Sequence, residues 1–159
     1  NNGDFVKDIK SIIKKRPFRS YELNTNYRST RQIVEYASKY QSKSGLTDCV
    51  RDGDIPVEFV AQDVENAAKL AKNYIYEAIE KGYENVAVIC KSNKEAVNFE
   101  KAIQLEYSLS NKINFKVLPL YLAKGLEYDC AIVWDVPDDM MYTACTRAMH
   151  QLVVIKKQG

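Results

Sequence analysis

Two short segments of almost continuously apolar residues constrain the fold of this chain more than any other feature. They are NVAVIC at positions 85–90 and DCAIVWDV at positions 129–136. A strand with one face in water alternates apolar and polar side chains, whereas these segments do not, which predicts strands buried on both faces. Such strands belong to a mostly parallel sheet with helices on both faces, so we expect an α/β domain.

The rest of the chain alternates between strand and helix patterns, as this fold class requires. The clearest helix is 63–81, where apolar residues recur at helical spacing until Gly82. A helix is also predicted over 29–43, with Ser29 or Thr30 as its N-cap. Further helices are predicted at 5–15, 94–107 and 139–150, further strands at 20–24, 57–61, 115–121 and 151–157, and a connector at 44–56.

Composition places only weak limits on the function. The 159 residues are 46% hydrophobic, which suffices for the core of one ordinary domain, and the formal net charge is only +2. That charge neither predicts nor excludes nucleic-acid binding, because a basic groove can lie within a nearly neutral protein. The four cysteines form no C-x-x-C pair and His150 is the single histidine, so we expect neither a zinc site nor a disulfide framework. The sequence shows no membrane span or signal peptide, and we expect a cytoplasmic protein.

The segment LNTNYRST (23–30) combines a predicted helix start with groups that suit a nucleotide. A helix N-terminus offers free N–H groups to an anion, and Arg28 adds a planar cation suited to phosphate. Tyr27 provides a flat face for a base. The alternative is a capped helix with a surface arginine and a packed tyrosine.

Two further motifs carry polar groups at predicted junctions. In AKGLEYD (123–129), Gly125 permits a backbone turn, Lys124 could meet a phosphate and Glu127 could accept hydrogen bonds from a sugar. In YTACTRAMH (142–150), Arg147 lies in the predicted helix and could stabilise charge on a transferred phosphoryl group. Taken singly, the first is equally an ordinary turn and the second a surface arginine with a carboxylate partner. Because ligands of parallel sheets bind at the carboxyl ends of strands, we expect the functional loops to follow strands.

The three motifs, in this order, resemble those of the second RecA-like motor domain in UvrD/Rep-like superfamily 1 helicases. The stretch LPLYLAKGLEYD (118–129) is most similar to the HelD (helicase IV-like) branch. VAVICKSNKEA (86–96) and RDGDIP (51–56) are also similar to this domain, so the resemblance covers nearly the whole chain. It implies a RecA-like P-loop NTPase fold, without a P-loop of its own, as a single domain over residues 1–159.

The resemblance also implies a role for each matching residue. Arg28 and Arg147 would contact the γ-phosphate as catalytic arginines, and Glu127 would bind the ribose. Tyr27 would stack on the adenine. The implied nucleotide-binding residues are Tyr27, Arg28, Lys124, Gly125, Glu127 and Arg147, and the residues near a single-stranded DNA track are Lys91, Ser92, Asn93 and Tyr121.

The sequence departs from the family in several respects, two of which concern the nucleotide and DNA sites. UvrD-type members usually carry Thr and His just before K-G-L-E, where this chain has Pro119 and Tyr121; Tyr121 could stack on a base instead. No G-x-x-x-x-G-K-[ST] motif occurs. We therefore expect ATP and Mg²⁺ to be shared with a first RecA-like domain that precedes this one in the same polypeptide.

Three functions remain open from the sequence. The first is the C-terminal motor domain of an ATP-dependent DNA helicase or translocase, inactive without its partner domain. The second is a HelD-like ATPase domain that acts on RNA polymerase. The third is a non-catalytic nucleic-acid-binding domain, although a domain without activity has no physical need for Arg28, Glu127 and Arg147 together.

Overall fold

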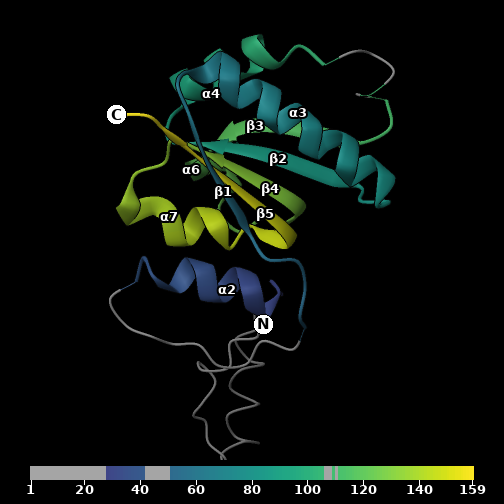
Figure 1. Cartoon of the computed structure of the whole chain (residues 1–159), viewed down its shortest axis with the longest axis vertical. Helices are drawn as coiled ribbons and strands as arrows, with labels where there is room; N and C mark the ends of the chain where they lie inside the picture. Colours follow the sequence, from purple (N-terminus) through teal and green to yellow (C-terminus); the bar gives the residue numbers. More distant parts are fainter. Residues whose placement is uncertain (1–27, 42–50, 106–108, 110) are drawn as a thin grey trace, which may run out of the picture.

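The protein is built on a five-stranded sheet in which every pair of neighbouring strands is parallel. The computed structural model describes residues 28–41, 51–105, 109 and 111–159 (Figure 1). The strands lie in the order β1 (Val57–Ala61), β5 (Ala148–Lys157), β4 (Tyr128–Trp134), β2 (Asn85–Cys90) and β3 (Asn114–Pro119). The predicted α/β class with a parallel sheet is confirmed. The predicted helix 5–15 and strand 20–24 lie outside the described residues.

Helices cover both faces of this sheet (Figure 1). One face is covered by α3 (Val64–Glu80) and α4 (Asn93–Ile103), and the other by α2 (Arg31–Ser38), α6 (Leu120–Ala123) and α7 (Asp138–Cys145). The burial of β2 on both faces explains why its sequence does not alternate between apolar and polar residues. Val86 and Val88 belong to the core on the α3 side, whereas Ala87 and Ile89 belong to the core on the α7 side. Both sets of side chains are removed from water, so both must be apolar.

The helix starts follow the capping residues in the sequence. Thr30 is the N-cap of α2, with its hydroxyl oxygen accepting from the Ile33 N–H at 3.4 Å. Asp63 caps α3 in the same way, accepting from the Asn66 N–H at 2.9 Å. After α3 the chain reverses at Gly82, whose φ of 81° is readily adopted only by glycine.

Several element ends differ from the predictions. The predicted helix 29–43 ends at Ser38, and the predicted strand 129–136 ends at Trp134. The predicted helix 94–107 ends at Ile103, because Gln104 adopts a left-handed conformation with φ of 39°. The predicted strand 115–121 ends at Pro119, so Tyr121 lies in α6. The predicted helix 139–150 ends at Cys145, and β5 begins at Ala148 because the sheet ladder to β4 already starts there.

The connection from β3 to β4 is short for a parallel crossover. Only residues 120–127 carry the chain across β2, from the end of one strand to the start of the other. Parallel crossovers usually take a dozen or more residues. The single turn of α6, with Leu120 and Ala123 buried against the sheet, makes this brief passage possible. The crossover therefore delivers the K-G-L-E motif to the start of β4.

Three cysteines of the described residues are buried and form no disulfide with one another. They are Cys90, Cys130 and Cys145, and burial raises the pKa of each thiol to about 12. Thiols with such a pKa are not nucleophiles at neutral pH. Within the described part of the chain, no helix is long and apolar enough to cross a membrane.

Candidate functional site

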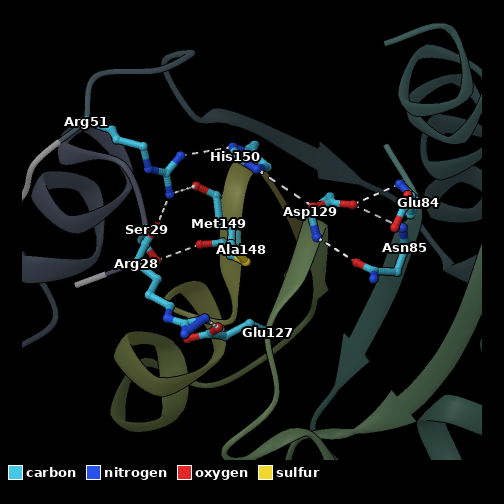
Figure 2. Close-up of polar contacts among 10 residues, drawn as sticks. All are labelled: Arg28, Ser29, Arg51, Glu84, Asn85, Glu127, Asp129, Ala148, Met149 and His150. Atoms are coloured by element: carbon cyan, nitrogen blue, oxygen red, sulfur yellow. Dashed lines mark hydrogen bonds and ion pairs between the residues drawn. The ribbon is translucent and has the colours of Figure 1, made fainter. Parts of the chain in front are cut away.

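The three sequence motifs meet where β4 and β5 begin, which we call the amino edge of the sheet. Glu127 directly precedes β4 and Arg147 directly precedes β5, and the two strands are paired at Tyr128 and Ala148. The Arg28 segment joins them because the Ser29 hydroxyl donates to the carbonyl of Ala148 at 2.6 Å (Figure 2). Segments remote in the sequence therefore form one site.

A cation and a carboxylate lie side by side at the centre of this site. The Arg28 Nη1 is 3.0 Å from the Glu127 Oε1, across 99 positions of sequence (Figure 2). The two side chains are 65% and 33% exposed, and exposed pairs contribute only about 0–1 kcal/mol to stability. The pair is therefore accessible to a ligand and costs little to rearrange.

Arg147 is held more firmly than Arg28, and it is not in a helix as predicted. Because α7 ends at Cys145, Arg147 lies in the turn before β5. Its Nε donates to the Thr143 carbonyl and its Nη1 to the Leu126 carbonyl, both at 3.0 Å, and its Nη2 lies 3.5 Å from the Thr146 hydroxyl. A guanidinium has five N–H groups, so these contacts leave two for a ligand while they orient the group.

The K-G-L-E turn adopts the backbone conformation that its glycine predicts. Gly125 has a φ of 81°, in the left-handed region, and no atom lies within 4 Å of the position that a Cβ would take. The Leu126 N–H closes the turn by donating to the carbonyl of Ala123 at 3.0 Å. Lys124 is exposed beside this turn. The glycine is thus required by the backbone, whatever the turn binds.

The residues predicted to lie near DNA are at the opposite end of the strands, which we call the carboxyl edge. Lys91 follows β2 and pairs with Asp135, with 3.3 Å between its Nζ and Oδ2. Ser92 is the N-cap of α4, accepting from the Glu95 N–H at 3.3 Å, and Asn93 is the first residue of that helix. Ser92 thus has a structural function irrespective of any ligand.

Tyr121 lies near these residues because β2 and β3 end together, with Cys90 paired to Pro119. Its side chain is in α6 and the residue is 64% exposed. A strand of six residues, such as β2, spans roughly 20 Å. The predicted nucleotide and DNA residues are therefore separated by about the length of the sheet.

The two groups of predicted site residues lie at opposite ends of their strands, and the expectation that functional loops follow strands stays a prediction. Lys91 and Tyr121 follow strands, whereas Glu127 and Arg147 precede them. The reason is that the K-G-L-E motif ends the crossover rather than beginning it, and that β5 begins earlier than its sequence pattern indicated. Tyr27, predicted to stack on adenine, lies outside the described residues.

Sequence reasoning missed a third arginine at the amino edge, beside Arg28 and Arg147. Arg51 lies with its Nη1 3.0 Å from the His150 Nδ1, and its Nη2 donates to the carbonyl of Arg28 and, at 3.4 Å, to that of Met149 (Figure 2). The His150 Nε2 is 3.7 Å from the Asp129 Oδ1. The only signal for Arg51 was the family likeness of RDGDIP, which implied no role for it.

The described residues at the amino edge include groups of the kinds that bind nucleotides. Arginine forks and a carboxylate are the groups that bind phosphates and sugar hydroxyls. Among the described residues, no group of three or more His, Cys, Asp or Glu side chains is placed to hold a metal ion.

The five-stranded parallel sheet with helices on both faces is an α/β fold consistent with a helicase C-terminal domain. The chain belongs to the UvrD-like helicase C-terminal domain family, whose model matches residues 21–119. A crystal structure described as the C-terminal domain of a possible DNA helicase from Lactobacillus plantarum WCFS1 is similar, with a TM-score of 0.66 and 28% sequence identity. That likeness covers 82% of this chain and 86% of that chain. No protein with a curated function matches, and neither the family match nor the structural match supports the HelD branch.

Proposed function

We propose that this chain is the second motor domain of an ATP-dependent superfamily 1 DNA helicase or translocase. It would complete an ATP site whose other half belongs to a first RecA-like domain, and it would form part of a single-stranded DNA track. The observation that carries this proposal is the exposed pair of Arg28 and Glu127 beside Arg147 at the amino edge. Family membership and the likeness to a helicase domain support it.

The site suggests what each residue does when ATP is bound. Arg28 would exchange the Glu127 carboxylate for a γ-phosphate oxygen, which carries more negative charge. Glu127, once released, would accept hydrogen bonds from the ribose. Arg147 would keep its bonds to the backbone and present its remaining N–H groups to the same phosphate. An arginine oriented in advance stabilises transition-state charge without the cost of reorganisation.

The carboxyl edge would carry the DNA contacts. Lys91 would meet a phosphate, Asn93 lies beside it, and the exposed ring of Tyr121 offers a face on which a base can stack. Closure of the two motor domains over ATP would change the position of this domain relative to the first one. The DNA contacts at the carboxyl edge would move with it.

Two alternative functions are compatible with the same fold. An ATPase domain that acts on RNA polymerase is suggested by the LPLYLAKGLEYD sequence alone, and no comparison adds to it. A non-catalytic nucleic-acid-binding domain would not need Arg147 to be oriented by three hydrogen bonds. We therefore favour the motor domain.

The test is steady-state ATP hydrolysis by the protein that joins this domain to its first motor domain, with and without single-stranded DNA. Arg28→Ala should lower turnover strongly, because the γ-phosphate would lose a charge-assisted contact. Arg31→Ala is the matched control, since Arg31 lies three residues away, is exposed and has its Nε 3.0 Å from the Asp52 Oδ1. Its turnover should stay close to that of the parent.

The 159-residue chain by itself should not hydrolyse ATP, because it lacks a P-loop. Magnesium-dependent turnover that follows this chain through purification would contradict the shared-site proposal. Equal turnover in the parent protein and the Arg28→Ala variant would also contradict it.

A further inference from the structure

We infer that Arg51 is a positioning residue that holds the backbone of Arg28, so that the Arg28 side chain is placed to contact a phosphate at the amino edge. The inference rests on the proposed function of Arg28. Its basis is the contact of the Arg51 guanidinium with the Arg28 carbonyl, together with contacts to His150 and to the Met149 carbonyl (Figure 2). One planar group thus joins the Arg28 segment to the start of β5.

Among the described residues of this segment, the hydrogen bonds to β5 begin at Ser29, so the backbone of Arg28 depends on another contact. Ser29 and Thr30 are buried, and they are bound to β5 through the Ala148 and Met149 carbonyls, at 2.6 Å and 3.3 Å. Arg28 itself is exposed. Its own carbonyl is bound by the side chain of Arg51. The direction in which the Arg28 side chain leaves the sheet edge therefore depends on Arg51.

Arg51 is in turn braced by His150. An arginine can only donate, so the His150 Nδ1 accepts and its Nε2 carries the proton that faces Asp129, 3.7 Å away. Asp129 is itself bound at its other oxygen by the N–H groups of Glu84 and Asn85, at 2.8 Å and 3.2 Å. The brace thus reaches from Arg51 across the starts of β5, β4 and β2.

The backbone around Arg51 is docked as closely as its side chain. The Arg51 carbonyl accepts from the Arg31 N–H at 2.8 Å, and the Gly53 N–H donates to the Gln32 Oε1 at 2.8 Å. A Cβ at Gly53 would lie 2.5 Å from the Thr30 Cγ2, so only glycine allows this approach. The segment 51–53 is therefore packed against the start of α2 and carries Arg51 to a defined place.

The fork of Arg51 matters more than its charge. Two of its nitrogens reach a ring nitrogen and two carbonyl oxygens at once. The single ammonium of a lysine cannot satisfy these three acceptors together. A loosened Arg28 would be misplaced relative to a phosphate, and a shift of about 1 Å can cost about 10²-fold in rate.

A double-mutant cycle in the two-domain protein tests the inference, with kcat and KM for ATP measured separately. Arg51→Ala should lower kcat by about 10–10²-fold, and Arg51→Lys should restore little of it. In an Arg28→Ala background, Arg51→Ala should cause almost no further loss of kcat, because its effect passes through Arg28. An Arg51→Ala loss that is equally large in both backgrounds would show a merely structural role and overturn the inference.

A second measurement uses the 159-residue chain and needs no ATPase activity. The Nε–H resonance of Arg28 in NMR spectra should move in the Arg51→Lys variant, towards the position of an unconstrained arginine. Asp52→Asn is the matched control, since Asp52 lies in the same segment and contacts Arg31 and Gln32 rather than Arg28; there the resonance should stay. An unmoved resonance in Arg51→Lys would contradict the positioning role.

The outcomes separate this inference from the proposed function. If Arg28→Ala leaves kcat unchanged, the proposed function of Arg28 fails and the inference fails with it. If Arg28→Ala lowers kcat while Arg51→Ala does not, the proposed function stands and Arg51 is not a positioning residue.

Discussion

The amino and carboxyl edges of the sheet are organised by different kinds of contact. At the amino edge, Arg28, Glu127 and Arg147 come from distant segments and are joined by contacts across the fold, such as the pair of Arg28 and Glu127, 99 positions apart. At the carboxyl edge, Ser92 caps the helix that it precedes. Lys91 pairs with Asp135 at the end of a strand adjacent to its own.

This difference shows which edge depends on the tertiary structure as a whole. A cap forms wherever the local backbone is helical, so the carboxyl edge is specified by neighbours in sequence and by adjacent strands. The amino edge exists only when α2, the short crossover and the turn before β5 are all in place. We expect substitutions there to alter activity through geometry, and substitutions at the carboxyl edge to alter binding one contact at a time.

The largest expected effect is that of Arg147→Ala in the two-domain protein. If Arg147 acts on the γ-phosphate, turnover should fall by about 10³–10⁵-fold, which corresponds to roughly 4–7 kcal/mol. Arg147→Lys should restore little, because an ammonium cannot hold the Leu126 and Thr143 carbonyls and still present a fork to the phosphate. The measurement is steady-state ATPase activity, with circular dichroism to confirm the fold and a fluorescent ATP analogue to report binding.

Arg147 also holds the K-G-L-E turn, so the control must separate the two roles. A purely structural arginine would lower the melting temperature and leave the turnover of the folded protein within about tenfold of the parent, or roughly 1.4 kcal/mol. That outcome would mean that Arg147 stabilises the fold at the amino edge and does not act on ATP. The proposed difference between the two edges would then be lost.

The next effect concerns DNA and the carboxyl edge. Tyr121→Ala should weaken binding of single-stranded DNA by about 1–3 kcal/mol if one base stacks on the ring, and Tyr121→Phe should retain most of the affinity. Glu127→Gln at the amino edge is the control and should leave the DNA affinity unchanged. Fluorescence anisotropy at low and moderate salt would measure both. An equal loss in Glu127→Gln would mean that the two edges are not separate sites.

The smallest effect compares two glycines with the same backbone conformation. Gly125 and Gly82 both have a φ of 81°, and neither has an atom within 4 Å of the position of an added Cβ. Alanine at either position should therefore lower the free energy of unfolding by about 1–2 kcal/mol, the cost of a left-handed residue with a side chain. Chemical denaturation of the 159-residue chain would measure this cost.

Only the alanine at Gly125 should also lower ATP turnover in the two-domain protein, because only that turn carries Glu127 to Arg28. Gly82 lies in the turn after α3, which carries none of the predicted nucleotide-binding residues, so Gly82→Ala serves as the matched control. Equal turnover in both variants would show that the turn at Gly125 is needed for the fold alone.

Much of the fold could be predicted from the sequence because its causes are local. The apolar run at 85–90 became β2, most of the run at 129–136 lies in β4, and the pattern at 63–81 became α3. Both strands are buried on both faces. Element ends were less predictable. Gln104 ended a helix in a left-handed conformation that no glycine marked, and the start of β5 depended on pairing with β4, which is a long-range event.

For the candidate site, the sequence by itself determined the chemistry: two arginines, a carboxylate and a glycine turn, in motifs that family resemblance could place in order. Only the tertiary structure decided where these groups lie. The brief crossover at 120–127 and the early start of β5 put Glu127 and Arg147 before their strands, at the amino edge. The contacts of Arg51 could not be predicted from the sequence for the same reason. Its partners Arg28, Met149 and His150 become neighbours only when the chain has folded. A residue's type states which contacts it can make, whereas the packing of the sheet decides which partners are within reach.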